Sequence, residues 1–198
     1  MGRPRGSSDP KATRARIVQA VTPVFAADGY AGASTRRLAA AANINVSTLA
    51  YHFGGKEGLY HAVLDARYAE LLAFPMPEDL PEDDDERIRA LVAAIYRFAR
   101  AHRGAVKILL RHALEHGPLP NGIRERWTER SFERIAALQA AMPRVPLLSR
   151  RLELLTLNHL IARYAVAADD GLAGIADGDP DKVVAAHIAE VAVRLLVH

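Results

Sequence analysis

The sequence predicts an all-α protein of about nine helices, in which a small N-terminal domain of three helices precedes a larger C-terminal helical domain. Apolar residues recur at spacings of three and four along most of the 198-residue chain, the pattern of helices with a buried face. Gly, Pro and Asn clusters divide this pattern into segments of helical length. No stretch shows the alternation of a strand. We therefore expect a basic, disordered tail over residues 1–10, the small domain over 11–55 and the large domain over 56–198.

Composition narrows the class of protein. Hydrophobic residues make up 50% of the chain, which is enough for a buried core, but no apolar run approaches the roughly 20 residues that span a bilayer. The N-terminal segment is basic and polar with no apolar stretch after it, unlike a signal peptide. The chain has no cysteines, which excludes disulfides and thiolate metal sites. We expect a cytoplasmic protein, and nothing in the sequence indicates a cofactor.

Positive charge is concentrated in the N-terminal third. Residues 1–60 hold eight Lys or Arg residues and three acidic residues, a net charge of +5, whereas the rest of the chain has 18 basic and 20 acidic residues, a net charge of −2. Such a distribution favours a nucleic-acid partner for the small domain.

The first predicted helix covers about residues 10–27 and ends at Gly29. Pro23 lies inside it, where it removes one backbone hydrogen bond and should bend the helix. The residues expected to face inward are Ile17, Val21, Val24 and Phe25.

Two short helices joined by a tight turn follow. The hydroxyl of Ser34 is placed to cap the first, residues 35–42, and Asn45 is placed to cap the second, residues 46–53. The predicted inward residues of the pair are Leu38, Ala39, Ala42, Ile44, Leu49 and Phe53. This arrangement is that of a helix-turn-helix.

The side chains left on the outside of the pair suit DNA. Hydroxyl groups that can contact phosphates or base edges are carried by Thr35, Ser47, Thr48 and Tyr51. Positive charge is supplied by Arg36, Arg37 and Lys56. Gly54 and Gly55 then allow a sharp turn into the next helix. The pattern predicts a DNA-binding domain whose partner is double-stranded DNA.

Residues 14–60 resemble the DNA-binding domain of the TetR family of bacterial transcriptional regulators. The resemblance rests on the segments FAADGY (25–30), TRRLA (35–39) and HFGGKEGL (52–59). Asn45-Val46 with the segment 51–60 is similar to a branch that includes regulators of drug-efflux and stress genes. Ala50 departs from the pattern, because many members have Tyr there; the corresponding phosphate contact is then absent or transferred to Tyr51.

The resemblance implies a homodimeric regulator, most simply a repressor that a small-molecule ligand releases from a near-palindromic operator. It implies no enzymatic activity. The residues expected to contact DNA are Thr35, Arg36, Asn45, Val46, Ser47, Thr48, Tyr51, His52 and Lys56.

Six helices are expected in the large domain. Their approximate spans are 56–74, 84–102, 104–115, 123–142, 148–169 and 180–197. The first is too long for the small domain alone and should link the two domains. The acidic run at 82–86 is expected to favour the start of the next helix, and residues 170–179 are expected to form a loop.

The last two predicted helices are apolar on more than one side and so need more than one packing partner. The resemblance implies that they form a dimer interface, and the alternative is that both belong to the core of a single chain. The residues expected at the interface are Leu152, Leu155, His159, Val184, Ile188, Val191 and Leu195.

A ligand cavity is expected among the middle helices of the large domain. An apolar cavity with a few polar groups would suit a lipophilic or aromatic molecule. The residues expected to contact the ligand are Tyr68, Tyr96, Arg111, His112 and Trp127.

One motif indicates a different class of protein. His112, Glu115 and His116 match the His-x-x-Glu-His pattern of inverted zinc proteases, in which two histidines one helical turn apart hold zinc and the glutamate activates water. No third-ligand motif follows, and Gly117-Pro118 ends the helix. A metal-responsive regulator, a zinc-dependent hydrolase and a helical interaction module that binds no DNA therefore remain as alternatives.

Overall fold

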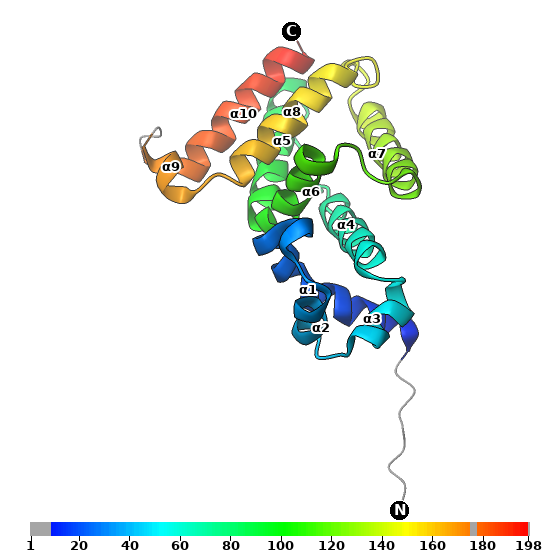
Figure 1. Ribbon diagram of the computed structural model, residues 1–198. Coiled ribbons are helices and arrows are strands. Elements are labelled where there is room, and N and C mark those ends of the chain that lie inside the picture. Colours follow the sequence, from blue (N-terminus) through cyan, green and yellow to red (C-terminus); the bar gives the residue numbers. More distant parts are fainter. Residues whose placement is uncertain (1–8, 175–177, 198) are drawn as a thin grey trace, which may run out of the picture. The chain divides into compact units, whose positions relative to one another are not determined.

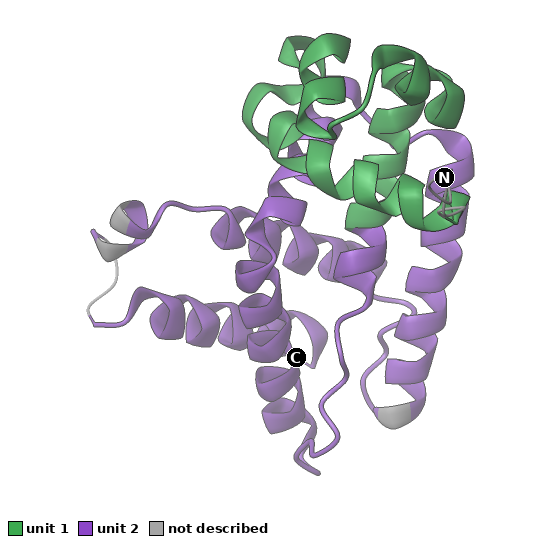
Figure 2. Ribbon diagram, turned by 90° about the horizontal axis from the view of Figure 1, so that it is seen from below, with its two compact units in different colours: residues 1–67 green, residues 68–198 purple. Residues whose placement is uncertain are grey.

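The computed structural model describes residues 9–174 and 178–197, and ten helices lie within these ranges. The chain forms two compact units, residues 1–67 and 68–198 (Figures 1 and 2). The division falls inside helix α4, whereas we expected a boundary between residues 55 and 56. In the described part of the chain, no helix combines the length and apolar character required to cross a membrane.

The first unit consists of α1 (Pro10–Gly32), α2 (Thr35–Ala41), α3 (Val46–Phe53) and the first part of α4 (Lys56–Leu72). α1 contacts α2, and α2 contacts α3. The ring of Tyr60 on α4 lies 5.0 Å from that of Phe25 on α1, which joins α4 to the same core. The largest of its fully buried side chains are Ile17, Val21, Phe25, Leu38, Leu49, Leu59, Val63 and Leu64.

Helix α1 begins earlier than the predicted small domain. The Asp9 carboxylate accepts a hydrogen bond from the Lys11 amide at 3.0 Å and so caps the helix. Residues 9 and 10 thus belong to a helix start, and the predicted disordered tail otherwise lies outside the described residues. Gly29 leaves the helical conformation at φ 69°, as expected for the end of the main helix. Val24 is half-buried, and Val18 is buried in its place.

The second unit contains the rest of α4 and six further helices. They are α5 (Asp84–Ala101), α6 (Arg103–His116), α7 (Asn121–Ala141), α8 (Arg151–Ala165), α9 (Asp169–Ala173) and α10 (Pro180–Leu196). α5 lies against α10 and α8 (Figure 1), and their apolar faces form one buried cluster. The short helix α9 occupies part of the predicted loop.

A partly exposed polar network ties the ends of these helices together. The Tyr96 hydroxyl donates to Asp181 Oδ1 at 3.0 Å, and Arg100 Nε donates to the same oxygen at 3.0 Å. Arg100 also donates to the backbone carbonyls of Ala165 and Ala167 and pairs with Asp169. One guanidinium on α5 thereby fixes the end of α8, the start of α9 and the first turn of α10.

Replacing Tyr96 with Phe removes one hydrogen bond from this network. We expect the free energy of unfolding to fall by about 1 kcal/mol at neutral pH. Burial, reinforced by the hydrogen bond to Asp181, raises the pKa of Tyr96 from 10.0 to about 12. The folded chain therefore holds this proton more tightly than the unfolded chain, so the stabilisation is complete below pH 10 and is lost as the pH rises to about 12.

Urea unfolding of the wild type and Tyr96→Phe, followed from neutral pH to pH 12, measures this effect. The stability difference should shrink across the upper part of the range. Tyr164→Phe controls for loss of a tyrosine hydroxyl elsewhere in the unit. A difference that stays constant up to pH 12 would contradict the role given to the Tyr96 proton.

Candidate nucleic-acid interface and ligand cavity

The turn between α2 and α3 is fixed by its backbone. Asn43 adopts a left-handed conformation at φ 51°, which Asn tolerates better than most residues. The amide of Asn43 donates to the carbonyl of Ala40 and that of Ile44 to the carbonyl of Ala39, both at 3.0 Å. These two bonds satisfy carbonyls at the end of α2, so α3 starts in a defined direction.

The predicted caps of both helices are confirmed. The Ser34 hydroxyl accepts from the Arg37 amide at 3.2 Å. Asn45 Oδ1 accepts three hydrogen bonds of 2.7 Å, from the Thr48 amide and from the hydroxyls of Ser47 and Thr48. One oxygen thus orients the first turn of α3, while both hydroxyl oxygens keep lone pairs that can accept hydrogen bonds.

Glycines allow the close turn after α3. Gly54 has φ 73° and its amide donates to the Ala50 carbonyl at 2.8 Å, which ends α3. A Cβ atom at Gly58 would lie 2.0 Å from the carbonyl oxygen of Phe53. Residue 58 must therefore be glycine for α4 to pass the end of α3 at this distance.

The predicted outward face of α3 is exposed. Leu49 and Phe53 are buried, whereas Val46 is 44% and Tyr51 86% exposed. Ser47 and Asn45 are exposed as well, and Thr48 and His52 are half-buried. The Tyr51 ring stands edge-on to His52 at 5.1 Å. The start of α3 and Tyr51 thus offer hydroxyl, amide and methyl groups to a partner, the groups that contact base edges in a major groove.

Several cations of the first unit serve its own structure. Arg14 donates to the carbonyl of His52, and its guanidinium lies 4.3 Å from the centre of the Phe53 ring. Arg16 donates to the carbonyl of Ala42 at 3.1 Å. These two arginines of α1 therefore hold the C-terminal ends of α3 and α2. No local sequence pattern indicates this role, because it depends on contacts between residues 38 and 26 positions apart.

The cations that we predicted for DNA differ in their surroundings. Arg37 pairs with Asp28. The Lys56 ammonium lies 4.5 Å from the centre of the Tyr30 ring and 3.5 Å from the carbonyl oxygen of Ala31. Thr35 is half-buried and Arg36 is exposed on α2, and no ion pair of Arg36 occurs within the described residues. Arg36 is therefore the predicted cation with the most freedom to meet a phosphate.

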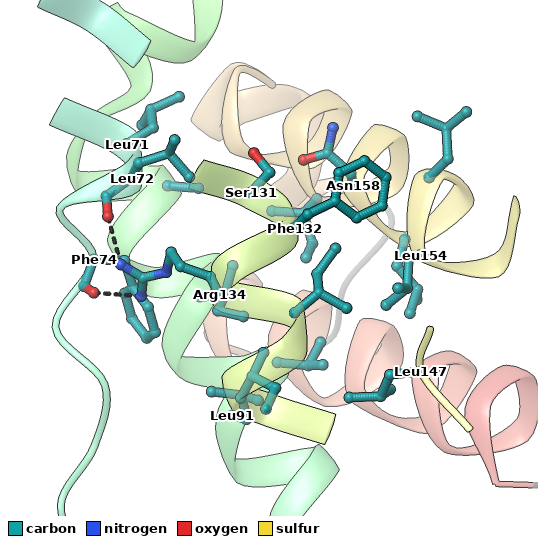
Figure 3. Close-up of a pocket in the computed structure, with 18 of the residues that line it drawn as sticks. Leu71, Leu72, Phe74, Leu91, Ser131, Phe132, Arg134, Leu147, Leu154 and Asn158 are labelled. Carbon is teal, nitrogen blue, oxygen red and sulfur yellow. Dashed lines mark hydrogen bonds between the residues drawn. The ribbon is translucent and has the colours of Figure 1, made fainter. Parts of the chain in front are cut away.

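The second unit contains a cavity of about 650 Å³ that is partly open to solvent. Its walls come mainly from α5, α7 and α8, with the end of α4 (Figure 3). Tyr68 and Trp127, two of the predicted ligand residues, line it and stack with their ring centres 6.1 Å apart. Burial raises the pKa of the Tyr68 hydroxyl, so this group is a neutral donor at physiological pH.

The other three predicted ligand residues do not line the cavity. The Tyr96 hydroxyl is directed to Asp181, and Arg111 pairs with Glu115 at 2.7 Å. His112 is buried, with its ring 5.4 Å from that of His116. The sequence places these three residues on the middle helices, but apolar periodicity does not reveal which face of α5 or α6 meets the cavity.

The residues of the His-x-x-Glu-His motif differ in their surroundings. Within residues 9–174 and 178–197, no group of three or more His, Cys, Asp or Glu side chains is arranged to hold a metal ion. Glu115 is exposed and engaged by Arg111, while His112 is buried. The structure therefore gives no support to the alternatives of a metal-responsive regulator or a zinc-dependent hydrolase.

The residues predicted for a dimer interface fall into two groups. Leu152, Leu155 and His159 on α8 are exposed, at 76% and 49% for the two leucines. Val191 and Leu195 on α10 are half-buried and pack against the core. Val184 and Ile188 are 4% and 0% exposed and belong to the core of the chain. A partner subunit cannot reach these last two side chains, which corrects the prediction for them.

The Asn45 cap provides a test of the local structure. Asn45→Ala should lower the free energy of unfolding by about 1 kcal/mol, because the start of α3 loses its acceptor. Asn45→Asp keeps the oxygen and adds a negative charge at a helix N-terminus, so it should retain stability. Urea unfolding of the three proteins measures this. An Asn45→Ala variant as stable as the wild type would contradict the role of the cap.

Comparison with known proteins agrees with this geometry. Residues 17–63, which include α2 and α3, match the model of the bacterial regulatory proteins of the tetR family. The HTH-type transcriptional repressor SCO4008 of Streptomyces coelicolor is 33% identical over 109 residues, 55% of this chain and 54% of that protein. The repressor NicS of Pseudomonas putida is 33% identical over 110 residues, 53% of this chain and 50% of that protein. These matches span about half the length of the relatives.

Solved structures share the fold over nearly the whole chain. The TetR family regulator PfmR of Thermus thermophilus has a TM-score of 0.63 at 18% identity, covering 90% of this chain and 97% of that one. The regulator SCO7222 of Streptomyces coelicolor has a TM-score of 0.61 at 21% identity, covering 92% and 96%. The family model thus covers residues 17–63, and the likeness to the solved structures shows a shared fold.

Proposed function

We propose that this chain is a DNA-binding transcriptional regulator that acts as a homodimer on a near-palindromic operator and is not an enzyme. The observation that carries the proposal is the exposed face of α3, where the Asn45 cap orients the hydroxyls of Ser47 and Thr48 beside Val46 and Tyr51. A short helix with uncharged polar groups at its start suits base edges in a major groove. Such a regulator acts on DNA in the cytoplasm.

In this proposal the regulator acts as a repressor rather than as an activator. The relatives SCO4008 and NicS are both named HTH-type transcriptional repressors, and their similarity to this chain supports the same mode here. In this proposal, DNA contacts come from Asn45, Val46, Ser47, Thr48, Tyr51 and His52, with Thr35, Arg36 and Lys56 on phosphates.

A dimer would place two copies of α3 in successive major grooves, about 34–36 Å apart. The exposed leucines of α8, Leu152 and Leu155, supply apolar surface for pairing and His159 lies on the same exposed part of the helix. Large exposed apolar side chains in neighbouring turns are typical of a surface that a partner covers.

Release from DNA would follow ligand binding in the second unit. The cavity of about 650 Å³ has the size and the mainly apolar lining of small-molecule sites. α4 ends beside this cavity, at Leu71 and Leu72, and begins in the unit that carries α3. A ligand that binds one position of α4 more tightly than another would shift the balance between the two, by no more than that difference in binding free energy.

Tyr51→Ala tests the DNA-binding surface. The side chain is almost fully exposed, so its loss should leave stability unchanged while operator affinity falls about tenfold or more, the loss of one or two good contacts. Tyr51→Phe separates the hydroxyl from the ring. Binding is measured by fluorescence anisotropy on an operator recovered from random DNA.

Asn45→Asp is the matched second variant. It should fold normally but bind more weakly, because its added charge faces the phosphates. If both Tyr51→Ala and Asn45→Asp bound the operator like the wild type, the exposed face of α3 would not be the DNA-binding surface.

A further inference from the structure

The cavity of the second unit is lined by charge of one sign. Arg124, Arg134 and Arg151 contribute to its lining, and among the described residues no aspartate or glutamate does. The remaining polar side-chain groups are the hydroxyls of Tyr68, Thr128 and Ser131, the Trp127 indole N–H and the Asn158 amide. A ligand with a positive charge would therefore find no carboxylate to compensate it, whereas a ligand with a negative charge would find guanidinium groups.

Most of the wall is apolar. Leucine, isoleucine, valine and phenylalanine side chains make up the larger part of the lining, and most of them come from α5, α7 and α8 (Figure 3). Transfer of an apolar ligand body from water to this surface is favourable. The cavity lining is thus mainly apolar and carries three arginine side chains.

The three arginines are not equally available. Arg134 donates through both terminal nitrogens to the carbonyls of Leu72 and Phe74 (Figure 3), and so closes the end of α4. Arg124 donates to the side chain of Asn121 at 2.8 Å. Arg134 therefore has a structural task, and the other two arginines are the candidates for a ligand.

Arg151 lines the cavity and is itself exposed to solvent. Its guanidinium lies 5.0 Å from the centre of the Phe132 ring, and its Nε is 3.4 Å from the carbonyl oxygen of Leu148. Phe132 and Leu148 both line the cavity. No carboxylate pairs with Arg151 within the described residues, so its two terminal nitrogens can form the paired hydrogen bonds that a carboxylate accepts.

We propose that the cavity binds an anionic amphiphile, an apolar chain or ring system that ends in one carboxylate, and that Arg151 holds the carboxylate. The inference rests on the proposed function for its regulatory meaning, since this ligand would be the one that releases DNA. The binding itself depends on the cavity alone.

A comparison of three head groups, an ammonium, an alcohol and a carboxylate, indicates the charge of the ligand. An ammonium group placed in the cavity gives up water without meeting an acidic partner, and burial of an uncompensated charge is costly. An alcohol gains at most a neutral hydrogen bond, which is weaker than one between charged groups. A carboxylate at Arg151 replaces its water with two charge-assisted bonds while its chain covers apolar wall.

The chain contains its own probe for this test. Trp127 is the only tryptophan in the sequence and lines the cavity, so its fluorescence reports occupation of this site. The titrants are decanoate, decanol and decylamine, which share one chain length and differ in the head group, used below their micelle concentrations at neutral pH. We expect decanoate to bind about tenfold or more tightly than decylamine, with decanol between them.

Arg151→Gln should remove the preference for decanoate while leaving the affinity for decanol unchanged. Arg126→Gln is the control, because Arg126 lies exposed on α7 and is not part of the cavity lining. Equal or tighter binding of decylamine by the wild type would overturn the ligand class. A preference that survives in Arg151→Gln and disappears in Arg124→Gln would overturn the assignment of Arg151.

DNA binding separates this proposal from the proposed function. The same three titrants are added to the protein–operator complex. If decanoate binds by fluorescence but an operator is never recovered, the regulator proposal fails and the ligand class stands. If an operator is bound and decanoate neither binds nor releases it, the ligand class fails and the regulator proposal stands.

Discussion

The exposed face of α3 depends on one short segment, Asn43 to Asn45. Its left-handed residue and its two backbone hydrogen bonds to α2 set where α3 begins, and Asn45 then orients the first turn with a single oxygen. Arg14 and Arg16 hold the far ends of α3 and α2 from α1. Because both ends of α3 are fixed, its outward side chains can be presented as a set, which is what recognition of a base sequence requires.

Charge and apolar surface have separate tasks in the two units. In the first unit, Arg14, Arg16 and Arg37 contact other groups of the same unit, whereas Arg36 is exposed. The net positive charge of this unit therefore overstates the number of side chains that are available to bind phosphates. In the second unit, Arg100 and Arg134 satisfy backbone carbonyls. The α5–α8–α10 core carries its own polar network, and part of its apolar surface lines the cavity.

Local signals explain what the sequence could predict. Ser34, Asn45 and Gly54 set helix ends through bonds within a few residues, and α3 matches the predicted residues 46–53. Local signals do not show which distant helix, or which subunit, a given helix face packs against. Val184 and Ile188 have the same apolar spacing whether they meet α5 or a partner subunit, and Tyr96 lies on the same helix as cavity residues but points to Asp181. The structural tasks of Arg14 and Arg16 also depend on the tertiary fold.

The most direct test of the account is selection of DNA from a random pool by the purified protein, followed by binding at two salt concentrations. Refolding from denaturant beforehand removes any ligand that holds the released state. We expect an inverted repeat with half-sites about one helical turn apart, bound by two chains, with affinity that falls steeply as salt rises. If the refolded protein enriches no sequence, the face of α3 does not recognise DNA and the account is wrong.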